Sequence, residues 1–355
     1  MILLRTWIVR IAFSVSVSRI DDVPVKFFYH ACLNIDLHAS EMTKDSALDH
    51  KIPRSLLYPR YWLTWFSLAL LAILAWFPVK LRDALAASCA GLVLRFSKKQ
   101  CYAARLNIGL CFPELSEQQR EQMLFRSICV GLKGFFALGE PTFLPAKRFL
   151  GRIKANGWEH VEAARKTGKP IIFMIPHTWT IDACGLYFSG MGLTMCTMMH
   201  SARNPVYDWF LNRQRVRFGG KVYERSAGLK PIIKDMRNGY NFFYLPDQDH
   251  GHDASVFVPL FGVPKATLPA LPKLAKLSGA IVLPVLATYN ESNRQYELQI
   301  RSAMEPYPTS DLMADVRYMN AEIEVLLKNH PEQYMWFLKY FRSLPDGGKR
   351  SYRPE

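Results

Sequence analysis

A histidine and an aspartate separated by four residues, His177 and Asp182, are the residues in this sequence best suited to acid–base chemistry. They belong to the segment KPIIFMIPHTWTID at positions 169–182. The apolar run from Ile171 to Ile175 is typical of a buried central strand, and the apolar-rich residues 181–193 are typical of a helix. The pair therefore lies at a predicted strand-to-helix turn, at the sheet edge where open α/β folds bind ligands.

This pair suits general base catalysis if the turn brings the two side chains together. Residues five positions apart on a regular helix point about 140° away from each other, so His177 must lie on the loop and Asp182 in the first helical turn. We expect the Asp182 carboxylate to accept a hydrogen bond from one imidazole nitrogen, which leaves the other nitrogen as a base. The alternative is that His177 only caps the helix, with Asp182 favoured there by the helix dipole.

Three further segments are expected near the same edge. Residues 203–237 contain nine Lys or Arg against three Asp or Glu, although a solvated charged helix has a similar composition. Residues 242–251, FFYLPDQDHG, are typical of a strand that ends in proline and delivers Asp247 and Asp249 to the edge that holds His177. Residues 281–285, IVLPV, predict another central strand.

The run DQDHGHD at residues 247–253 contains side chains that also bind metals. Its spacing matches no closed zinc pattern, so we expect no metal site there.

The order of predicted elements indicates an α/β fold. Strands are expected at 171–175, 193–199, 241–245 and 281–287, and helices at 181–190, 205–217, 228–237 and 267–278. An edge strand at 295–301 and a helix at 312–328 follow. Upstream, residues 84–96 and a segment opened by Ser116, with Gln119 in a capping-box position, predict accessory helices. We therefore expect a mixed, mostly parallel sheet covered by helices.

The strongest membrane signal runs from Tyr61 to Val79, nineteen residues without a charge. This length is close to the ~20 residues that a spanning helix needs, and aromatic residues lie near both ends. We expect an N-terminal membrane-anchoring helix. A buried core helix or a helix lying in the interface is the alternative, and basic residues on both sides leave the orientation open.

Composition narrows the class of protein. With 355 residues, half of them hydrophobic, the chain can form one large α/β domain and an accessory segment. A net charge of +15 indicates an acidic partner, such as nucleic acid, anionic lipid or an acidic carrier protein. The aromatic interleaving typical of RNA-binding proteins is absent, so we expect no nucleic acid partner. Seven cysteines without C-x2-C pairing favour a reducing compartment.

These patterns divide the chain into five parts. We expect an N-terminal extension at 1–56, a membrane anchor at 57–80, an accessory helical segment at 81–150, an α/β catalytic domain at 151–345 and a tail at 346–355. Residues 1–41 make a poor signal peptide because Arg10 interrupts their apolar run and no clear small-residue cleavage site follows. Met42 is an alternative start of translation.

Residues 57–345 resemble the bacterial lipid A late acyltransferases, which belong to the wider H-x4-D/E acyltransferases together with glycerol-phosphate acyltransferases. The resemblance is carried, in order, by LYPRYW, PHTWTID, HSARNPVYDW, RVRFGGKVYERSAG, YLPDQDHG, KATLPA and HPEQYMWFLK. The wording of RFGG, GLKP, LPDQDHG and KATLPA looks most like the branch that adds the last acyl chain, usually myristoyl. Residues 1–41 lie outside the resemblance.

The resemblance implies a glycerol-phosphate-acyltransferase-like fold and a reaction. A fatty acyl chain, myristoyl or similar, would pass from acyl carrier protein to the 3-hydroxyl of an acyl chain on a Kdo-lipid A precursor. The work would take place at the cytoplasmic face of the bacterial inner membrane, among its lipids, with no covalent enzyme intermediate, no cofactor beyond the acyl donor and no metal.

The resemblance also implies roles for individual residues. His177, oriented by Asp182, would be the general base. Arg217 and Arg225 would bind the anionic substrates or stabilise the thioester oxyanion, a task that backbone N–H groups after His177 also suit. The resemblance does not assign Asp247 and Asp249 directly, and we expect them to have a structural role in the substrate site.

Other functions remain open. A glycerol-phosphate or lysophospholipid acyltransferase would keep His177 and Asp182 but carry a P-E-G-T-type block where this chain has LPDQDHG. A membrane-tethered module that binds anionic lipid or carrier protein through residues 203–237 would leave His177 structural. A serine hydrolase is disfavoured because no G-x-S-x-G elbow is present. The sequence leaves acyl chain length, oligomeric state and the order relative to other late acyltransferases open.

Overall fold

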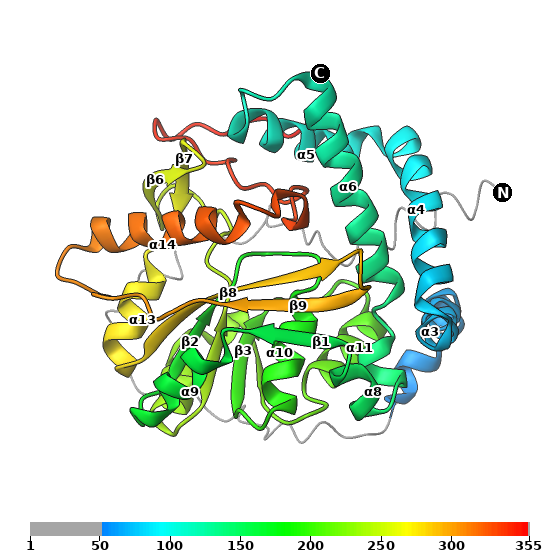
Figure 1. Cartoon of the computed structure of the whole chain (residues 1–355), viewed down its shortest axis with the longest axis horizontal. Helices are drawn as coiled ribbons and strands as arrows, with labels where there is room; N and C mark the ends of the chain where they lie inside the picture. Colours follow the sequence, from blue (N-terminus) through cyan, green and yellow to red (C-terminus); the bar gives the residue numbers. More distant parts are fainter. Residues whose placement is uncertain (1–51, 354–355) are drawn as a thin grey trace.

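Residues 52–353 are described in a computed structural model (Figure 1). A seven-stranded sheet with the strand order β1-β9-β8-β2-β5-β3-β4 forms its centre. Only β8 and β9 pair antiparallel among these neighbours, so the predicted mixed, mostly parallel sheet is confirmed. The predicted N-terminal extension lies outside the described residues up to residue 51, and so does the alternative start at Met42.

The strands of the structure include every strand that the sequence pattern predicts. They are β1 (Ile153–Asn156), β2 (Ile171–Met174), β3 (Met195–Met199), β4 (Lys221–Glu224), β5 (Asn241–Tyr244), β8 (Ile281–Asn290) and β9 (Gln295–Ile300), with β6 (Val256–Leu260) and β7 (Val263–Thr267) as a separate antiparallel pair. The pattern misses β1 and β4, two four-residue strands at the two edges of the sheet. It also misses the β6–β7 hairpin, whose prolines weaken a strand signal.

Helices cover both faces of the sheet. They are α3 (Trp62–Trp76), α4 (Val79–Phe96), α5 (Lys98–Cys111), α6 (Glu117–Phe136), α7 (Glu140–Phe143), α8 (Ala146–Leu150), α9 (Trp158–Lys166), α10 (Ile181–Gly190), α11 (Pro205–Arg215), α12 (Lys230–Arg237), α13 (Ala270–Ser278) and α14 (Leu312–Leu327). Short 3-10 turns lie at Arg54–Leu57, Pro59–Tyr61, Arg225–Ala227 and Pro331–Gln333. The predicted capping box of α6 is present, with Ser116 and Gln119 bonded reciprocally.

The central strand β2 is buried on both sides. Ile171 and Phe173 belong to a core that includes α9 and α10, whereas Ile172 and Met174 belong to a second core that includes α12, α13 and α14. Figure 1 shows α14 on the opposite side of β8 and β9 from α9 and α10. Alternating side chains with helices on both faces explain why this strand is apolar throughout.

The expected anchor helix is divided in two. Helix α3 has 15 residues and ends at Trp76, and Phe77 is extended with φ −67° and ψ 147°. Pro78 explains this break, because proline disfavours helical backbone in the residue before it. Pro78 itself is the N-cap of the next helix, α4. Within residues 52–353, no helix is both long and apolar enough to cross a membrane.

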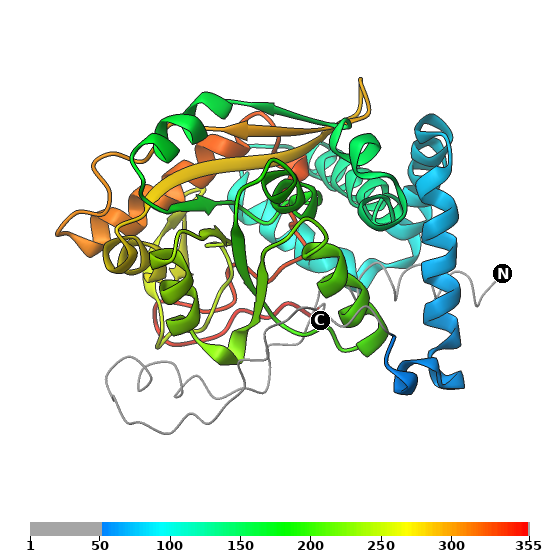
Figure 2. The same ribbon diagram turned by 90° about the horizontal axis from the view of Figure 1, so that it is seen from below.

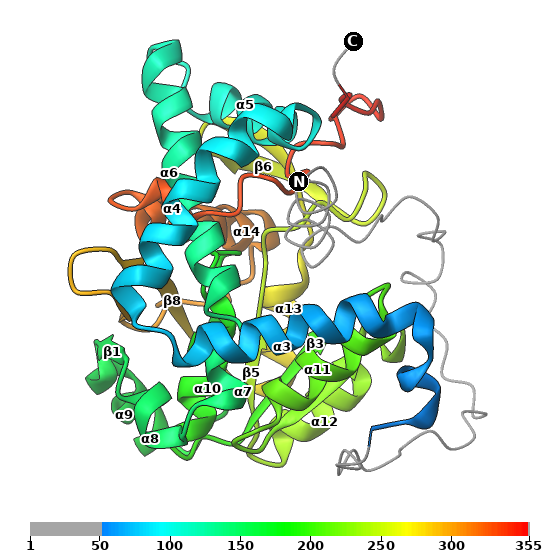
Figure 3. The same ribbon diagram turned by 90° about the vertical axis from the view of Figure 1, so that its right-hand side faces the viewer.

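Helix α3 packs along the α/β domain. The Ser67 hydroxyl lies 2.8 Å from that of Tyr207 on α11, and the Trp65 and Trp209 rings lie 5.7 Å apart. Figure 3 shows α3 crossing in front of α11 and α7, and Figure 2 shows it at one side of the molecule. Its other face carries exposed apolar side chains, including Leu63 and Ile73.

Candidate active site

Two neighbouring parallel strands position the central residues of the site. Met174 on β2 is in register with Tyr244 on β5, and the Ile175 N–H donates to the Tyr244 carbonyl at 2.9 Å. His177 follows Met174 by three residues, and Asp247 follows Tyr244 by three residues. The equal spacing places both side chains together at the carboxyl edge of the sheet.

Asp247 holds His177 through both of its carboxylate oxygens. The His177 backbone N–H donates to Oδ2 at 2.7 Å, and the ring Nδ1 is bonded to Oδ1. Burial alone would raise the pKa of Asp247, but the His177 ring, through its charge when it is protonated, and these hydrogen bonds hold that pKa below its ordinary value. Because an ionised carboxylate only accepts, Nδ1 carries the proton and Nε2 is left as the basic nitrogen.

The rest of the His177 loop is fixed by its neighbours. The Gln248 amide nitrogen lies 3.2 Å from His177 Nε2. On the backbone side, the Met335 N–H donates to the His177 carbonyl at 2.9 Å, and Thr178 forms an antiparallel bridge with Tyr334. The loop thus forms a short ladder with the C-terminal segment.

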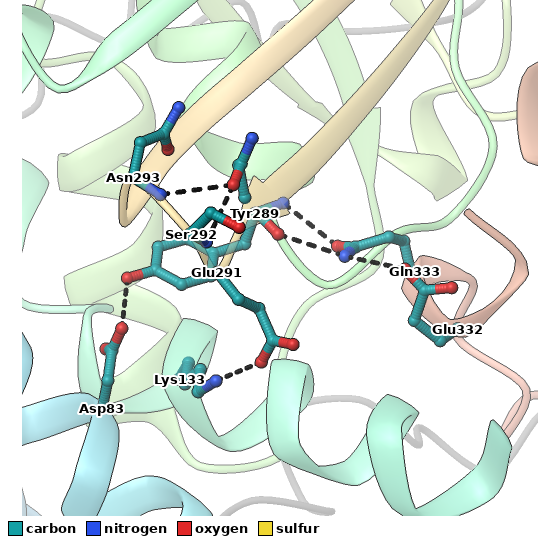
Figure 4. A network of polar contacts seen from close by, with 9 residues as sticks. Asp83, Lys133, Tyr289, Glu291, Ser292, Asn293, Glu332 and Gln333 are labelled. Atoms are coloured by element: carbon teal, nitrogen blue, oxygen red, sulfur yellow. Dashed lines mark hydrogen bonds and ion pairs between the residues drawn. The ribbon is translucent and has the colours of Figure 1, made fainter. Parts of the chain in front are cut away.

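Gln333 ties that C-terminal segment to the sheet. Its side chain accepts from the Tyr289 N–H at 3.0 Å and donates to the Tyr289 carbonyl at 3.2 Å, as Figure 4 shows. The Tyr289 hydroxyl in turn donates to Asp83 on α4 at 2.5 Å. His177 is therefore held by groups from several elements, which suits a preorganised base.

The predicted bond between His177 and Asp182 is wrong. Both Asp182 oxygens accept from one guanidinium, Arg215 Nε at 2.7 Å and an Arg215 Nη at 3.2 Å. Burial disfavours the charged Arg215, yet the adjacent Asp182 carboxylate raises the pKa of the guanidinium overall. The guanidinium of Arg215 thus binds the Asp182 carboxylate through two parallel hydrogen bonds. Asp247 binds His177, whereas Asp182 binds Arg215.

Asp249 and Arg225 lie in the loops around this pair. Asp249 accepts from the Ser343 backbone N–H at 2.7 Å and the Ser343 hydroxyl at 2.8 Å, so it fixes the C-terminal segment. Arg225 donates to His250 Nδ1 at 2.6 Å. Burial, followed by the charges of Arg225, Lys265 and His177, lowers the pKa of His250 to about 3.

A buried lysine completes the charges of this region. Lys265 is fully buried, and its ammonium donates to the Ala266 carbonyl at 3.0 Å. Burial lowers its pKa to about 8, against the opposing influence of Asp247 and Asp249.

Arg217 has partners outside the His177 cluster. Its guanidinium donates to the Pro141 carbonyl and, at 2.8 Å, to the Leu144 carbonyl, and it lies over the Phe218 ring. These bonds join α11 to the α7–α8 connection. The structure therefore gives Arg217 a structural setting, whereas Arg215, which the sequence reasoning did not single out, pairs with Asp182.

Three residues near the site, Arg215, Gln248 and Lys265, were not predicted individually, although each lies in a segment that the sequence singles out. Arg215 belongs to the basic segment 203–237, but the sequence does not show which of its arginines faces Asp182. Gln248 lies between the two predicted aspartates. Lys265 lies in the KATLPA block and gives no periodic signal. Among residues 52–353, no group of three or more His, Cys, Asp or Glu is placed to hold a metal ion.

An imidazole whose Nδ1–H is fixed by a buried carboxylate, at the carboxyl edge of an α/β sheet, suits proton removal from a nucleophile. The model of the bacterial lipid A biosynthesis acyltransferase family matches residues 50–343. The chain belongs to this family.

Relatives that match most of the chain carry related names. The chain is 41% identical over 293 residues to a lipid A biosynthesis acyltransferase of Haemophilus influenzae, covering 82% of this chain and 92% of the relative. It is 34% identical over 300 residues to the lipid A biosynthesis myristoyltransferase of Escherichia coli, covering 84% and 93%. The Escherichia coli lauroyltransferase is 31% identical over 299 residues, covering 84% and 97%.

Proposed function

We propose that this protein transfers a fatty acyl chain from acyl carrier protein to a 3-hydroxyl on an acyl chain of the Kdo-lipid A precursor. The observation that carries the proposal is the His177–Asp247 pair at the sheet edge in a chain of this family. The acyl carrier thioester is the only co-reactant that the proposal requires, with no metal or other cofactor.

In the proposed reaction, the acceptor hydroxyl attacks the thioester carbonyl while His177 Nε2 takes its proton. Asp247 stabilises the resulting imidazolium through Nδ1–H. The tetrahedral intermediate then collapses, the C–S bond breaks, and the imidazolium returns the proton to the leaving carrier thiolate. Backbone N–H groups at the start of α10, which helical bonds leave unpaired, are candidates to bind the oxyanion.

The charge of the chain suits both proposed substrates. The carrier protein is acidic, and the acceptor carries phosphates and sugar carboxylates, so a chain with a net charge of +15 attracts both. Arg225 lies on the connection after β4, at the same edge as His250 and Asp247. We propose Arg225 as an anion-binding residue and Asp249 as a residue that shapes the substrate site.

We also propose that α3 and α4 contact the bilayer at the cytoplasmic face of the inner membrane. Trp62, Leu63, Ile73 and Trp76 on α3 are more than half exposed, and exposed apolar residues continue along α4. Leu68, Leu71 and Leu74 on the same helix are buried against the protein. An apolar face that wide on the outside of the molecule marks a binding surface, and tryptophans near both helix ends are typical of a membrane interface.

For the acyl chain we propose myristoyl or a chain of similar length. Identity to the Escherichia coli myristoyltransferase is 34%, against 31% for the lauroyltransferase and 30% for the palmitoleoyltransferase. The sequences of the motifs RFGG, GLKP, LPDQDHG and KATLPA also resemble the branch that usually adds myristoyl.

A substrate panel tests this proposal. Membranes that carry the wild type are incubated with myristoyl, lauroyl or palmitoyl carrier protein, and the acceptors are Kdo-lipid A precursors with four or five acyl chains, glycerol phosphate and lysophospholipid. Mass spectrometry of the lipids should show one added acyl chain on the lipid A precursor, with myristoyl preferred. Acylation of glycerol phosphate or lysophospholipid alone would reject the acceptor, and binding to carrier or lipid without any product would support a binding module.

A further inference from the structure

A narrow cavity of about 90 Å³ lies between α10 and the strands β3, β4 and β5. One end is lined by Asp182, Arg215 and Leu245, and Leu245 precedes Asp247 by two residues. The other end is lined by Ser189 and Met195. The cavity therefore begins next to the proposed catalytic residues.

The direction of the elements shows how the cavity runs. Helix α10 passes from Asp182 at the carboxyl edge of the sheet to Ser189 seven residues later, a distance of about 10 Å along a helix axis. Strand β3 runs in the opposite sense, from Met195 to Met199. The cavity thus extends along the strands from the active-site edge into the domain.

The side chains at its inner end are buried and mostly apolar. Leu186, Met195 and Ser189 are 1%, 5% and 7% exposed. Gly185 leaves the helix side of the cavity without a side chain, and a Cβ there would lie 3.3 Å from the Phe243 ring. The outer end carries instead the charged Asp182–Arg215 pair. An apolar interior with a polar mouth suits a ligand with a hydrocarbon tail and a polar head.

The cavity is small, so it would have to lengthen to hold a whole acyl chain. An engineered cavity of about 150 Å³ holds benzene, so the space present accommodates only part of an acyl chain. Met195 and Met199 line the wall, and their unbranched side chains repack at small cost. Displacement of these side chains would lengthen the cavity.

We infer that this cavity receives the end of the donor acyl chain and that Ser189 and Met195 set the preferred chain length. This inference rests on the proposed acyl transfer. The thioester carbonyl must lie beside His177 when the hydroxyl attacks, so the chain attached to that carbonyl enters the cavity past Leu245 and the Asp182–Arg215 pair. The acceptor remains outside, where its phosphates and sugars meet solvent and basic side chains.

The test compares two variants that change the inner end in opposite directions. Ser189→Leu fills it, and Met195→Ala enlarges it. Each enzyme is assayed with one acceptor and with carrier protein charged with saturated chains of increasing length. We expect the Ser189→Leu optimum to move to shorter donors, with at least a tenfold loss on the wild-type optimum, and the Met195→Ala optimum to move to longer donors.

Met236→Ala is the matched control, because Met236 is a buried methionine of α12 in the other core. It should leave the chain-length optimum unchanged while it lowers thermal stability comparably to Met195→Ala. Unchanged donor optima in both cavity variants, with acyl transfer intact, would overturn the inference and leave the proposed function standing. The inference would also be overturned if the cavity variants changed the preference for the acyl chains of the acceptor and not the preference for the donor chain.

A binding assay separates the inference from catalysis. Saturated fatty acids of different lengths compete with a fluorescent fatty acid for the wild type and for Ser189→Leu. The inference predicts that Ser189→Leu weakens the long competitors at least tenfold more than the short ones. Equal effects on all lengths, or no binding to the wild type, would overturn it. Failure of acyl transfer in the wild type would instead reject the proposed function.

Discussion

His177 and Asp247 lie 70 residues apart in the sequence, yet the Asp247 carboxylate is hydrogen-bonded to His177. Their strands are paired in parallel, each residue follows its strand by the same three positions, and the Asp247 carboxylate binds both the backbone and the ring of His177. A carboxylate with two bonds to one residue fixes the ring orientation as well as its tautomer. The His177 ring is therefore held in one orientation, and Asp182 belongs to a separate ion pair.

The two aspartates should differ in their effect on catalysis. Asp247→Asn should lower kcat by about 10²–10⁴, because the imidazolium loses its anionic partner. Asp182→Asn should lower the rate less, because Asp182 binds Arg215 and not the His177 ring. Rates of both variants, each checked for folding, test this, and a larger loss in Asp182→Asn would favour the pairing that the sequence suggested.

The Asp182–Arg215 pair should show strong coupling in stability. Removing one partner leaves a partly buried charge, so Asp182→Ala and Arg215→Met should each lower the free energy of unfolding by about 1–3 kcal/mol. The double variant should recover part of that loss, with a coupling energy of about 0.5–3 kcal/mol. Urea unfolding of the four proteins measures this cycle. Strict additivity would show that the two side chains act independently.

The half-buried His250 should make stability depend on pH. Its pKa is lowered to about 3, so the unfolded chain takes up a proton near the ordinary value of 6.5 while the folded chain does not. The free energy of unfolding should therefore fall as pH drops through 6.5, by up to about 1.4 kcal/mol per pH unit for this group. His250→Asn should reduce this slope between about pH 7 and pH 4. Equal slopes in unfolding experiments would show that His250 is protonated in the folded protein.

The outer face of α3 should control membrane binding. Ile73→Asp places a charge on a residue that is 61% exposed, and it should weaken sedimentation with vesicles of anionic phospholipid severalfold while leaving thermal stability nearly unchanged. Leu277→Asp on α13 is the control, because Leu277 is 54% exposed but far along the chain from α3. Similar losses in both variants would point to general surface effects.

The sequence predicts the sheet and the helices around it well because both depend on local patterns. The β2 segment is apolar at every position, and Ser116 with Gln119 marks the start of α6. The sequence pattern also places Asp247 at the same edge of the sheet as His177. The bonding partner of His177 was not predictable in the same way, since H-x4-D spacing suggests a local bond. The actual bond depends on the register of β2 with β5, and the guanidinium that takes Asp182 comes from the end of α11.

The most direct test of the central claim is the rate of acyl transfer by His177→Ala. Purified membranes with the wild type or the variant receive myristoyl carrier protein and the Kdo-lipid A precursor, and the masses of the lipid products are followed over time. His330→Ala is the control, because His330 lies in the turn after α14 and its ring is 47% exposed. We predict a loss of at least about 10² in rate for His177→Ala and little change for His330→Ala. A folded His177→Ala protein that keeps its rate within tenfold of the wild type would contradict His177 as the base.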